Sequence, residues 1–256
     1  MRRVFISLIT TGALCVTTLA QAQGQFAGLG DRVKDLVGGM DQGGNRNDSA
    51  QQLPQSEVVS GLKGALADGA SSAVTQLGQT DGFWGDQARR IALPGWMSQA
   101  SSMLRTAGYG DQMNGLQLSM NRAAEQATAE AGPIVRETIN SMSVADAYKI
   151  LQGSDTAATD YLRQHSGEEL AAKFRPIIER TTAESQAVSR YESLTSQAKP
   201  MLKFIPGMNL DMNNYVTQQT LDGLFAVIGQ QESRIRANPA AAGSSIVKKV
   251  FSTVSN

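Results

Sequence analysis

Polar side chains in the middle of the chain have types and spacings that could do chemistry. They are Asn121, Arg122, Glu125, Asp155, Thr156, Thr159 and Asp160. Residues three and four apart are neighbours on a helix surface, so the first three share one side of a predicted helix. An arginine among carboxylates and amides forms a polar cluster that can bind a ligand. Glu125 or Asp155 could also act as the helix-borne carboxylate of an enzyme. We name these residues the candidate polar site.

The candidate polar site has a structural interpretation as well. If the two helices that carry it pack as a hairpin, the same side chains would form interhelical hydrogen bonds and helix caps. Convergence of Asn121, Glu125 and Asp155 at an open cavity would favour binding or catalysis. Burial with mutual hydrogen bonds would favour packing, and the sequence leaves both alternatives open.

Several other chemistries lack the residues that they need. His165 is the only histidine and Cys15 the only cysteine. A zinc or di-iron site requires several His, Cys or carboxylate ligands at helical spacing, and no Glu-x-x-His pair occurs. A Ser-His-Asp triad would need the same lone histidine, without a G-x-S-x-G motif to support it. We therefore predict no metal site and no cofactor.

One segment imitates the start of a calcium-binding loop. Asn209, Asp211 and Asn213 match its first three ligand positions, but Asn214 stands in place of the glycine at position six and Thr220 in place of the glutamate at position twelve. We interpret Asp211 as a turn or helix-cap residue instead.

Helical signals surround the candidate polar site. Apolar residues recur at steps of three and four at Met113, Leu116, Met120, Ala124, Ala127 and Ala131. This pattern predicts a helix with one buried face. Ser143, with Asp146 three residues later, predicts a capping box. Ser154 or Asp155 is expected to cap the helix after that.

The rest of the chain has the same helical period. We predict helices capped by Ser56, by Ser166 and by Thr217, with Pro176 kinking the second of them or splitting it in two, and a short helix near 244–251. Phe83 and Trp84 are expected to plug one end of the core. No sustained alternation of β-branched residues occurs, so strands are not expected. The predicted class is all-α, a compact multi-helix bundle or array with a flexible N-terminal segment.

Five blocks of sequence in one order resemble a known family. They are LQLSMNRAAE, ILQGSDTAATDYLR, KFRPII, YVTQQTLDGLFAVI and IRANPAAA. Together they resemble the uncharacterised bacterial family catalogued as domain of unknown function 4197, from about Ser56 to Phe251. The resemblance implies a secreted helical envelope protein and assigns no activity. The chain departs from the family pattern near its end, at Gly229 to Gln231 and at Gly243 and Ser244.

The N-terminus has the features of a secretory signal peptide. Arg2 and Arg3 precede an apolar stretch, and Ala20-Gln21-Ala22 forms an A-x-A cleavage site. We expect cleavage after Ala22 and a periplasmic mature protein. Cys15 does not lie in a lipobox, because Leu14 precedes it. The predicted organisation is a signal peptide over 1–22, a flexible or disordered segment with a possible weak helix over 23–55, and one helical domain over 56–252.

The net charge does not favour a nucleic-acid partner, and the hydropathy does not favour a membrane span in the mature chain. Loss of Arg2 and Arg3 leaves 21 basic residues against 23 acidic ones, which does not favour nucleic acid. No later apolar run approaches the roughly 20 residues of a membrane span, so the mature protein is expected to be soluble. Lys248 and Lys249 could contact an anionic membrane surface, although two charges bind weakly.

The sequence therefore leaves two functional classes. The first is a non-enzymatic periplasmic protein that binds an envelope partner or a small ligand. The alternative is an enzyme that acts on envelope material through Glu125 or Asp155.

Overall fold

The computed structural model describes residues 54–198 and 211–239, all of which belong to one structural unit, Gln52–Asn256. Within these ranges every extended regular element is an α-helix, and no strand occurs. The predicted all-α class is confirmed. The predictions for the signal peptide, for the segment before Pro54 and for the helix near 244–251 lie outside the described residues.

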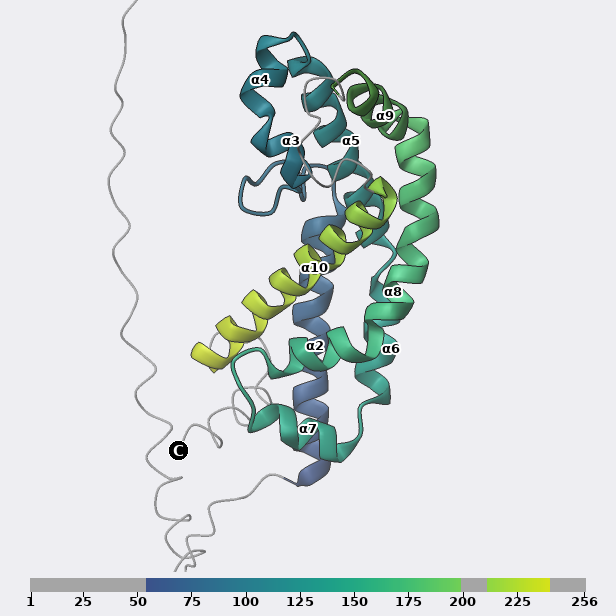
Figure 1. Cartoon of the computed structure of the whole chain (residues 1–256). Helices are drawn as coiled ribbons and strands as arrows, with labels where there is room; N and C mark the ends of the chain where they lie inside the picture. The colour runs from purple at the N-terminus through teal and green to yellow at the C-terminus, as the bar shows by residue number, and fades with distance from the viewer. Residues whose placement is uncertain (1–53, 199–210, 240–256) are drawn as a thin grey trace, which may run out of the picture. The chain divides into compact units, whose positions relative to one another are not determined.

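Four long helices form the centre of the described unit. The helices are α2 (Gln55–Gly78), α3 (Gly95–Gln99), α4 (Ser101–Thr106), α5 (Gly110–Ala129), α6 (Gly132–Ser141), α7 (Val144–Leu151), α8 (Ala157–Glu184), α9 (Ala187–Ala198) and α10 (Met212–Ala237). Helices α5 and α10 pack on each other, and each of them packs on both α2 and α8 (Figure 1). Helices α6 and α7 cover α2 and α8, and α9 covers α5 and α8. No helix of the described ranges is both long and apolar enough to cross a membrane.

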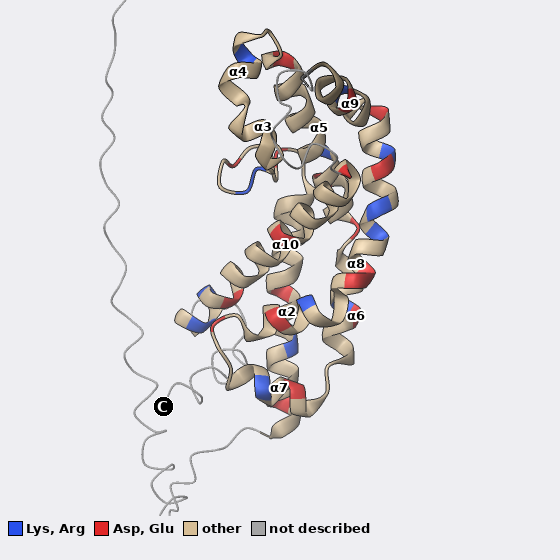
Figure 2. Ribbon diagram, viewed as in Figure 1, with Lys and Arg blue, Asp and Glu red and all other residues tan. Residues whose placement is uncertain are grey.

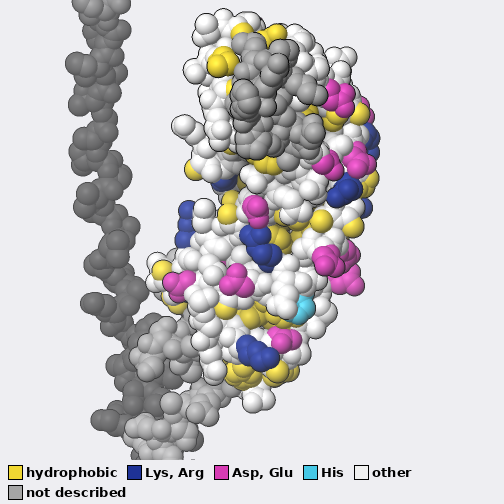
Figure 3. Space-filling view, in the orientation of Figure 1, with side chains coloured by type: hydrophobic (Ala, Val, Ile, Leu, Met, Phe, Trp, Pro, Cys, Tyr) yellow, Lys and Arg dark blue, Asp and Glu magenta, His cyan; other side chains and the backbone are white. Residues whose placement is uncertain are grey.

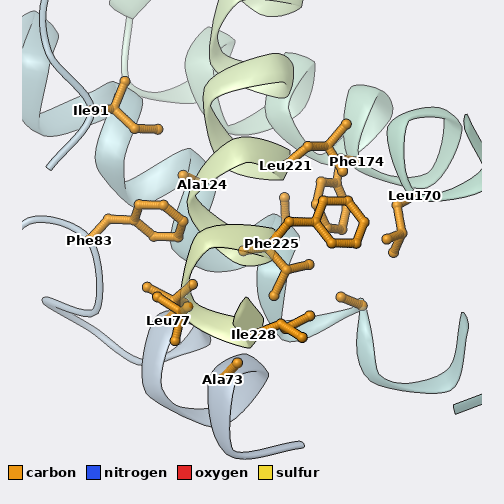
Figure 4. Packing of buried hydrophobic residues seen from close by; sticks show 14 of the residues in the cluster. Ala73, Leu77, Phe83, Ile91, Ala124, Leu170, Phe174, Leu221, Phe225 and Ile228 are labelled. Atoms are coloured by element: carbon orange, nitrogen blue, oxygen red, sulfur yellow. The ribbon is translucent and has the colours of Figure 1, made fainter. Parts of the chain in front are cut away.

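The core joins these helices to the loop between α2 and α3. Phe83 from this loop is fully buried near Leu77 of α2 and Phe225 and Ile228 of α10 (Figure 4). Gly223 on α10 makes room for the ring, because a Cβ atom there would lie 2.5 Å from Phe83 Cε1. Phe83 thus plugs the core as predicted, whereas Trp84 is only partly buried.

Hydrogen bonds confirm the predicted capping box at Ser143 and show that Asp211, predicted as a turn or helix-cap residue, is a helix cap. The hydroxyl of Ser143 accepts from the backbone N–H of Asp146 at 3.1 Å, and the Asp146 carboxylate accepts from Ser143 N at 3.3 Å. This reciprocal pair is the capping box of α7. Asp211 caps α10 by accepting from Asn214 N at 3.0 Å. Both signals act within four residues, so the sequence contains everything that they need.

Three other predicted caps are wrong. Helix α2 begins at Gln55 after Pro54, and Ser56 makes no cap. Ser166 and Thr217 lie inside α8 and α10, where their hydroxyls donate to the carbonyls of Leu162 at 2.6 Å and Asn213 at 2.7 Å. A serine or threonine can bond the carbonyl four residues earlier as well as cap a helix, and burial favours the first use here. Helix α8 does not begin at Ser166. It runs through both Ser166 and Pro176 without a break.

Candidate functional site

The structure divides the candidate polar site into two separate groups. Asn121, Arg122 and Glu125 lie on α5, and Asp155, Thr156, Thr159 and Asp160 lie at the start of α8. Helices α5 and α8 do pack together, but Gln126 accepts its hydrogen bond from Thr181 at 2.8 Å. Thr181 follows Thr159 by 22 residues, or about 33 Å of helix. The expected single cluster is therefore wrong, because the contact is made by the far end of α8.

Glu125 holds the loop that follows α2. Its side chain is buried, and one carboxylate oxygen accepts from the backbone N–H groups of Phe83 and Trp84, both at 3.1 Å. The other oxygen accepts from Arg122 at 2.7 Å. Arg122 also reaches Asp81 at 2.7 Å, and the hydrogen bond to Glu125 is the main cause that raises the pKa of Arg122. Every oxygen of Glu125 thus has a partner within the fold.

Asn121 holds the same loop at a second point. Its amide oxygen accepts from Ile91 N at 2.8 Å, and its amide nitrogen donates to the carbonyls of Ile91 at 3.1 Å and Gln117 at 2.8 Å. We call Asn121, Arg122 and Glu125 the loop clamp. None of them lines any of four cavities of about 50 to 500 Å³ among the described residues. Hydrogen bonding within the fold, without convergence at an open cavity, is what we expected of a packing role. We therefore assign a packing role to the loop clamp.

The start of α8 is capped by a residue that the sequence does not single out. Glu232 of α10 is buried and accepts from the backbone N–H groups of Ala158 and Thr159, both at 2.9 Å. It also accepts from the Thr159 hydroxyl at 2.8 Å. The predicted cap by Ser154 or Asp155 is wrong, because a carboxylate more than 70 residues away supplies it.

Arg236 completes this arrangement. It pairs with Glu232 at 2.9 Å and donates to the carbonyl of Ile150, near the end of α7, at 2.8 Å. Only 11% of its side chain is exposed. Glu232 and Arg236, which we call the helix-end clamp, thus join α7, α8 and α10. Their spacing of four residues was the one sequence signal that could have pointed to them, and such pairs are common on exposed helix faces.

A groove lies directly beside the helix-end clamp. It has a volume of about 500 Å³ and is lined by the first turns of α8 and the second half of α10. Its lining is Thr156, Thr159, Asp160, Arg163, Phe225, Ala226, Gly229, Gln230, Ser233 and Arg234. Three members of the candidate polar site therefore line this α8/α10 groove, and Asp155 does not. Gly229 adds no side chain to the floor between Thr156 and Thr159.

The α8/α10 groove has charges of both signs above an aromatic base. The Arg163 guanidinium lies 4.7 Å from the ring centre of the buried Phe225 and pairs with Asp222 at 2.8 Å. Asp160 accepts from the Thr156 hydroxyl at 3.4 Å, and Arg234 is exposed. Acidic and basic residues are also interspersed along the rest of α8 (Figure 2). The groove can therefore contact either sign of charge.

The described residues offer no metal centre. No three His, Cys, Asp or Glu side chains in 54–198 and 211–239 come together to hold an ion. His165 is exposed on α8, stacks on Tyr161 with ring centres 4.0 Å apart and contacts the Tyr161 carbonyl through Nδ1 at 2.8 Å. Its contacts are those of a surface residue within α8.

Fold and site together define a class: an all-α protein with two buried glutamate clamps, one of which borders a charged groove. Residues 52–252 match the family model described as protein of unknown function (DUF4197), and the chain belongs to this family. The resemblance found in the five sequence blocks is thereby confirmed. No curated protein and no solved structure matches the chain.

Proposed function

We propose that this protein is exported to the periplasm and there binds a small polar ligand in the α8/α10 groove, without transforming it. One observation supports this proposal above others. The groove combines exposed groups of both charges with an aromatic base, and it stands on helix ends joined by the helix-end clamp. A preformed polar groove on rigid elements is suited to ligand recognition.

The size and chemistry of the groove agree with a small ligand. Small-molecule sites have volumes of roughly 300 to 1,000 Å³ and combine apolar walls with a few charged or polar groups. In this groove Ala226 supplies exposed apolar surface, and Phe225 lies buried beneath the Arg163 guanidinium, while Asp160, Arg163 and Arg234 supply the charges. A ligand with an apolar part and charged groups of both signs would be complementary to it.

The helix-end clamp gives the groove a fixed geometry. Thr159 donates to Glu232 through both its backbone and its hydroxyl, so its side chain is held in one position. Ser233, beside Glu232, donates to the carbonyl of Asp155 at 3.3 Å. Binding groups that are already ordered lose less entropy when a ligand arrives.

The contacts of the carboxylates favour binding over the enzymatic alternative. A general acid must reach the substrate within hydrogen-bond distance. Both oxygens of Glu125 are engaged by Phe83, Trp84 and Arg122, and the residue does not line the α8/α10 groove. Asp155 is exposed and does not line the groove.

A capture experiment tests the binding proposal. The mature chain is purified from periplasm without denaturation, and the small molecules that it releases on unfolding are identified by mass spectrometry. Ala226→Trp should fill the groove from its rim and abolish the retained ligand. Ala183→Trp replaces an exposed alanine of α8 that does not line the groove, so it should retain the ligand as the parent does. Equal retention by both variants, or no retained molecule in the parent, contradicts the proposal.

The export proposal has its own test. It is supported by the basic, apolar and A-x-A order of residues 1–22. N-terminal sequencing of the fractionated protein should show a periplasmic chain that begins at Gln23. An intact Met1, or acylation at Cys15, would overturn the export proposal while leaving the groove untouched.

A further inference from the structure

A second cavity, of about 200 Å³, lies between α5 and α9 and shares no residue with the α8/α10 groove. One leucine and six polar side chains line it. The polar residues are Tyr109, Gln112, Ser189, Arg190, Ser193 and Gln197. Arg190 is the only charged residue of the lining. The α5/α9 cavity is therefore rich in hydrogen-bond donors and lacks a carboxylate.

Internal hydrogen bonds orient these donors. Tyr109 donates through its hydroxyl to the Gln197 amide oxygen at 3.1 Å, and the Gln197 amide nitrogen donates to the Ser193 hydroxyl oxygen at 2.6 Å. Ser193 is thus occupied as an acceptor, and no acceptor for its own hydroxyl hydrogen is found among the described side chains. The relay leaves Ser193 able to donate to a bound group.

The position of the arginine depends on a glycine of α5. An added Cβ atom at Gly115 would lie 2.6 Å from a terminal nitrogen of Arg190, so the guanidinium rests against the helix backbone at this point. No ion pair joins Arg190 to a carboxylate in the described part of the chain. Asp111 and Glu192, the acidic residues nearest in sequence to this lining, do not line the cavity.

We propose that the α5/α9 cavity binds a small oxyanion, namely inorganic phosphate or a phosphate monoester. A guanidinium presents a planar fork of N–H donors that matches phosphate oxygens, and charge-assisted hydrogen bonds of this kind are stronger than neutral ones. The hydroxyls of Ser189 and Ser193 and the amide of Gln112 add neutral donors beside it. Without a carboxylate in the lining, the anion meets no like charge there.

The proposal is tested by titrating the mature chain with inorganic phosphate and, separately, with glycerol 3-phosphate, at constant ionic strength. We expect saturable NMR shifts in α5 and α9 with at least one of the two, and the pattern of response distinguishes free phosphate from its esters. Arg190→Gln should weaken binding about tenfold or more, because a charge-assisted hydrogen bond is lost. Arg180→Gln, at an exposed arginine of α8, should leave binding unchanged. Absence of saturable binding, or equal loss in both variants, overturns the proposal.

A second variant separates binding from folding. Gly115→Ala keeps every charge, but its methyl group must displace the Arg190 guanidinium. Alanine is favoured over glycine inside a helix, so the melting temperature should hold or rise while phosphate affinity falls. Unchanged phosphate affinity in Gly115→Ala would show that the guanidinium does not form the site and would overturn the proposal.

Discussion

The loop clamp and the helix-end clamp have the same arrangement of hydrogen bonds in two different regions of the molecule. In each, a buried glutamate accepts hydrogen bonds from two consecutive backbone N–H groups, those of Phe83 and Trp84 for Glu125 and those of Ala158 and Thr159 for Glu232. Each glutamate also pairs with an arginine on its own helix. In both clamps a carboxylate, rather than water, accepts the hydrogen bonds of two backbone N–H groups that would otherwise be unbonded.

The two clamps differ in the segments that they join and in the solvent exposure of their arginine side chains. The loop clamp fixes an irregular loop near the surface, where the Arg122 side chain is 33% exposed and also contacts Asp81. The helix-end clamp joins the ends of α7 and α8 in the interior, where Arg236 is 11% exposed. Breaking a pair is costly in proportion to how completely the remaining charge is buried. The same device should therefore contribute more at the helix ends than at the loop.

The surroundings of the clamps differ as well. The helix-end clamp borders the α8/α10 groove, whereas no residue of the loop clamp lines that groove. On the face in Figure 3, acidic and basic side chains are interspersed without a large field of one sign. The charged groove beside the helix-end clamp is thus a more specific indication of function than surface charge.

The largest effect is expected from Glu232→Leu. This change leaves Arg236 without its carboxylate and leaves two N–H groups of α8 without an acceptor, so the free energy of unfolding should fall by about 3 to 5 kcal/mol. Urea unfolding of the mature chain measures the loss. Glu168→Leu, at an exposed glutamate of α8, is the control and should change stability by about 0.5 kcal/mol or less. A loss smaller than that of Glu125→Leu would break the comparison between the clamps.

Glu125→Leu should cost less, about 2 to 3 kcal/mol. The backbone N–H groups of Phe83 and Trp84 lose their acceptor, but Arg122 can turn to solvent and keep Asp81. The same urea measurement applies, and limited proteolysis should show faster cleavage in the loop after α2. Ligand retention by the α8/α10 groove should be unchanged. Loss of the ligand in a folded Glu125→Leu protein would contradict the separation of the two regions.

Gly223→Ala probes the contact between the clamped loop and α10. The new methyl group would overlap the Phe83 ring, and overpacking of this kind costs about 1 to 3 kcal/mol. Phe83→Leu in the same chain should recover part of the loss, because the smaller side chain makes room. A double-mutant cycle measures this coupling. Strict additivity of the two changes would show that they do not meet.

Glu125→Gln tests whether the loop clamp has a role beyond packing. The amide keeps one acceptor oxygen and loses the charge-assisted part of its hydrogen bonds, so the loss should be about 1 to 2 kcal/mol. Complementation of a strain that lacks the protein should be normal. A variant that melts like the parent and yet fails to complement would assign the carboxylate a function.

The smallest effect is expected from Ser143→Ala, which removes the local capping box of α7. The Ser143 hydrogen bond is the main cause that lowers the pKa of Asp146 below its ordinary value of 3.8. A lowered pKa means that the carboxylate contributes stability above the ordinary value and loses it as pH falls through the lowered one. The melting temperatures of parent and variant should therefore differ most at neutral pH, and part of the difference should be lost as the pH falls below about 4. The cap from Asp146 N–H to the Ser143 hydroxyl does not titrate, so a smaller difference should remain. A difference that stays constant to pH 2 would contradict this.

The sequence by itself determined the features that depend on neighbours along the chain. The apolar period of α5, the capping box at Ser143 and the cap at Asp211 each act within a few residues, so their residues could be recognised without a structure. Phe83 was predictable as a plug because a large apolar ring in a polar, glycine-rich loop has nowhere else to be buried.

Only the tertiary structure decided which polar residues meet. Ser166 and Thr217 have the sequence of caps, but burial of a continuous helix turned their hydroxyls to the preceding turn. Glu125 was predictable as important, but its backbone partners Phe83 and Trp84 were not, because they lie more than 40 residues earlier in the chain. The pattern of residues around Glu232 on α10 does not predict that its carboxylate accepts hydrogen bonds from the start of α8. Hydrogen-bond partners across the core depend on the packing of whole helices, and local residue patterns do not encode that packing.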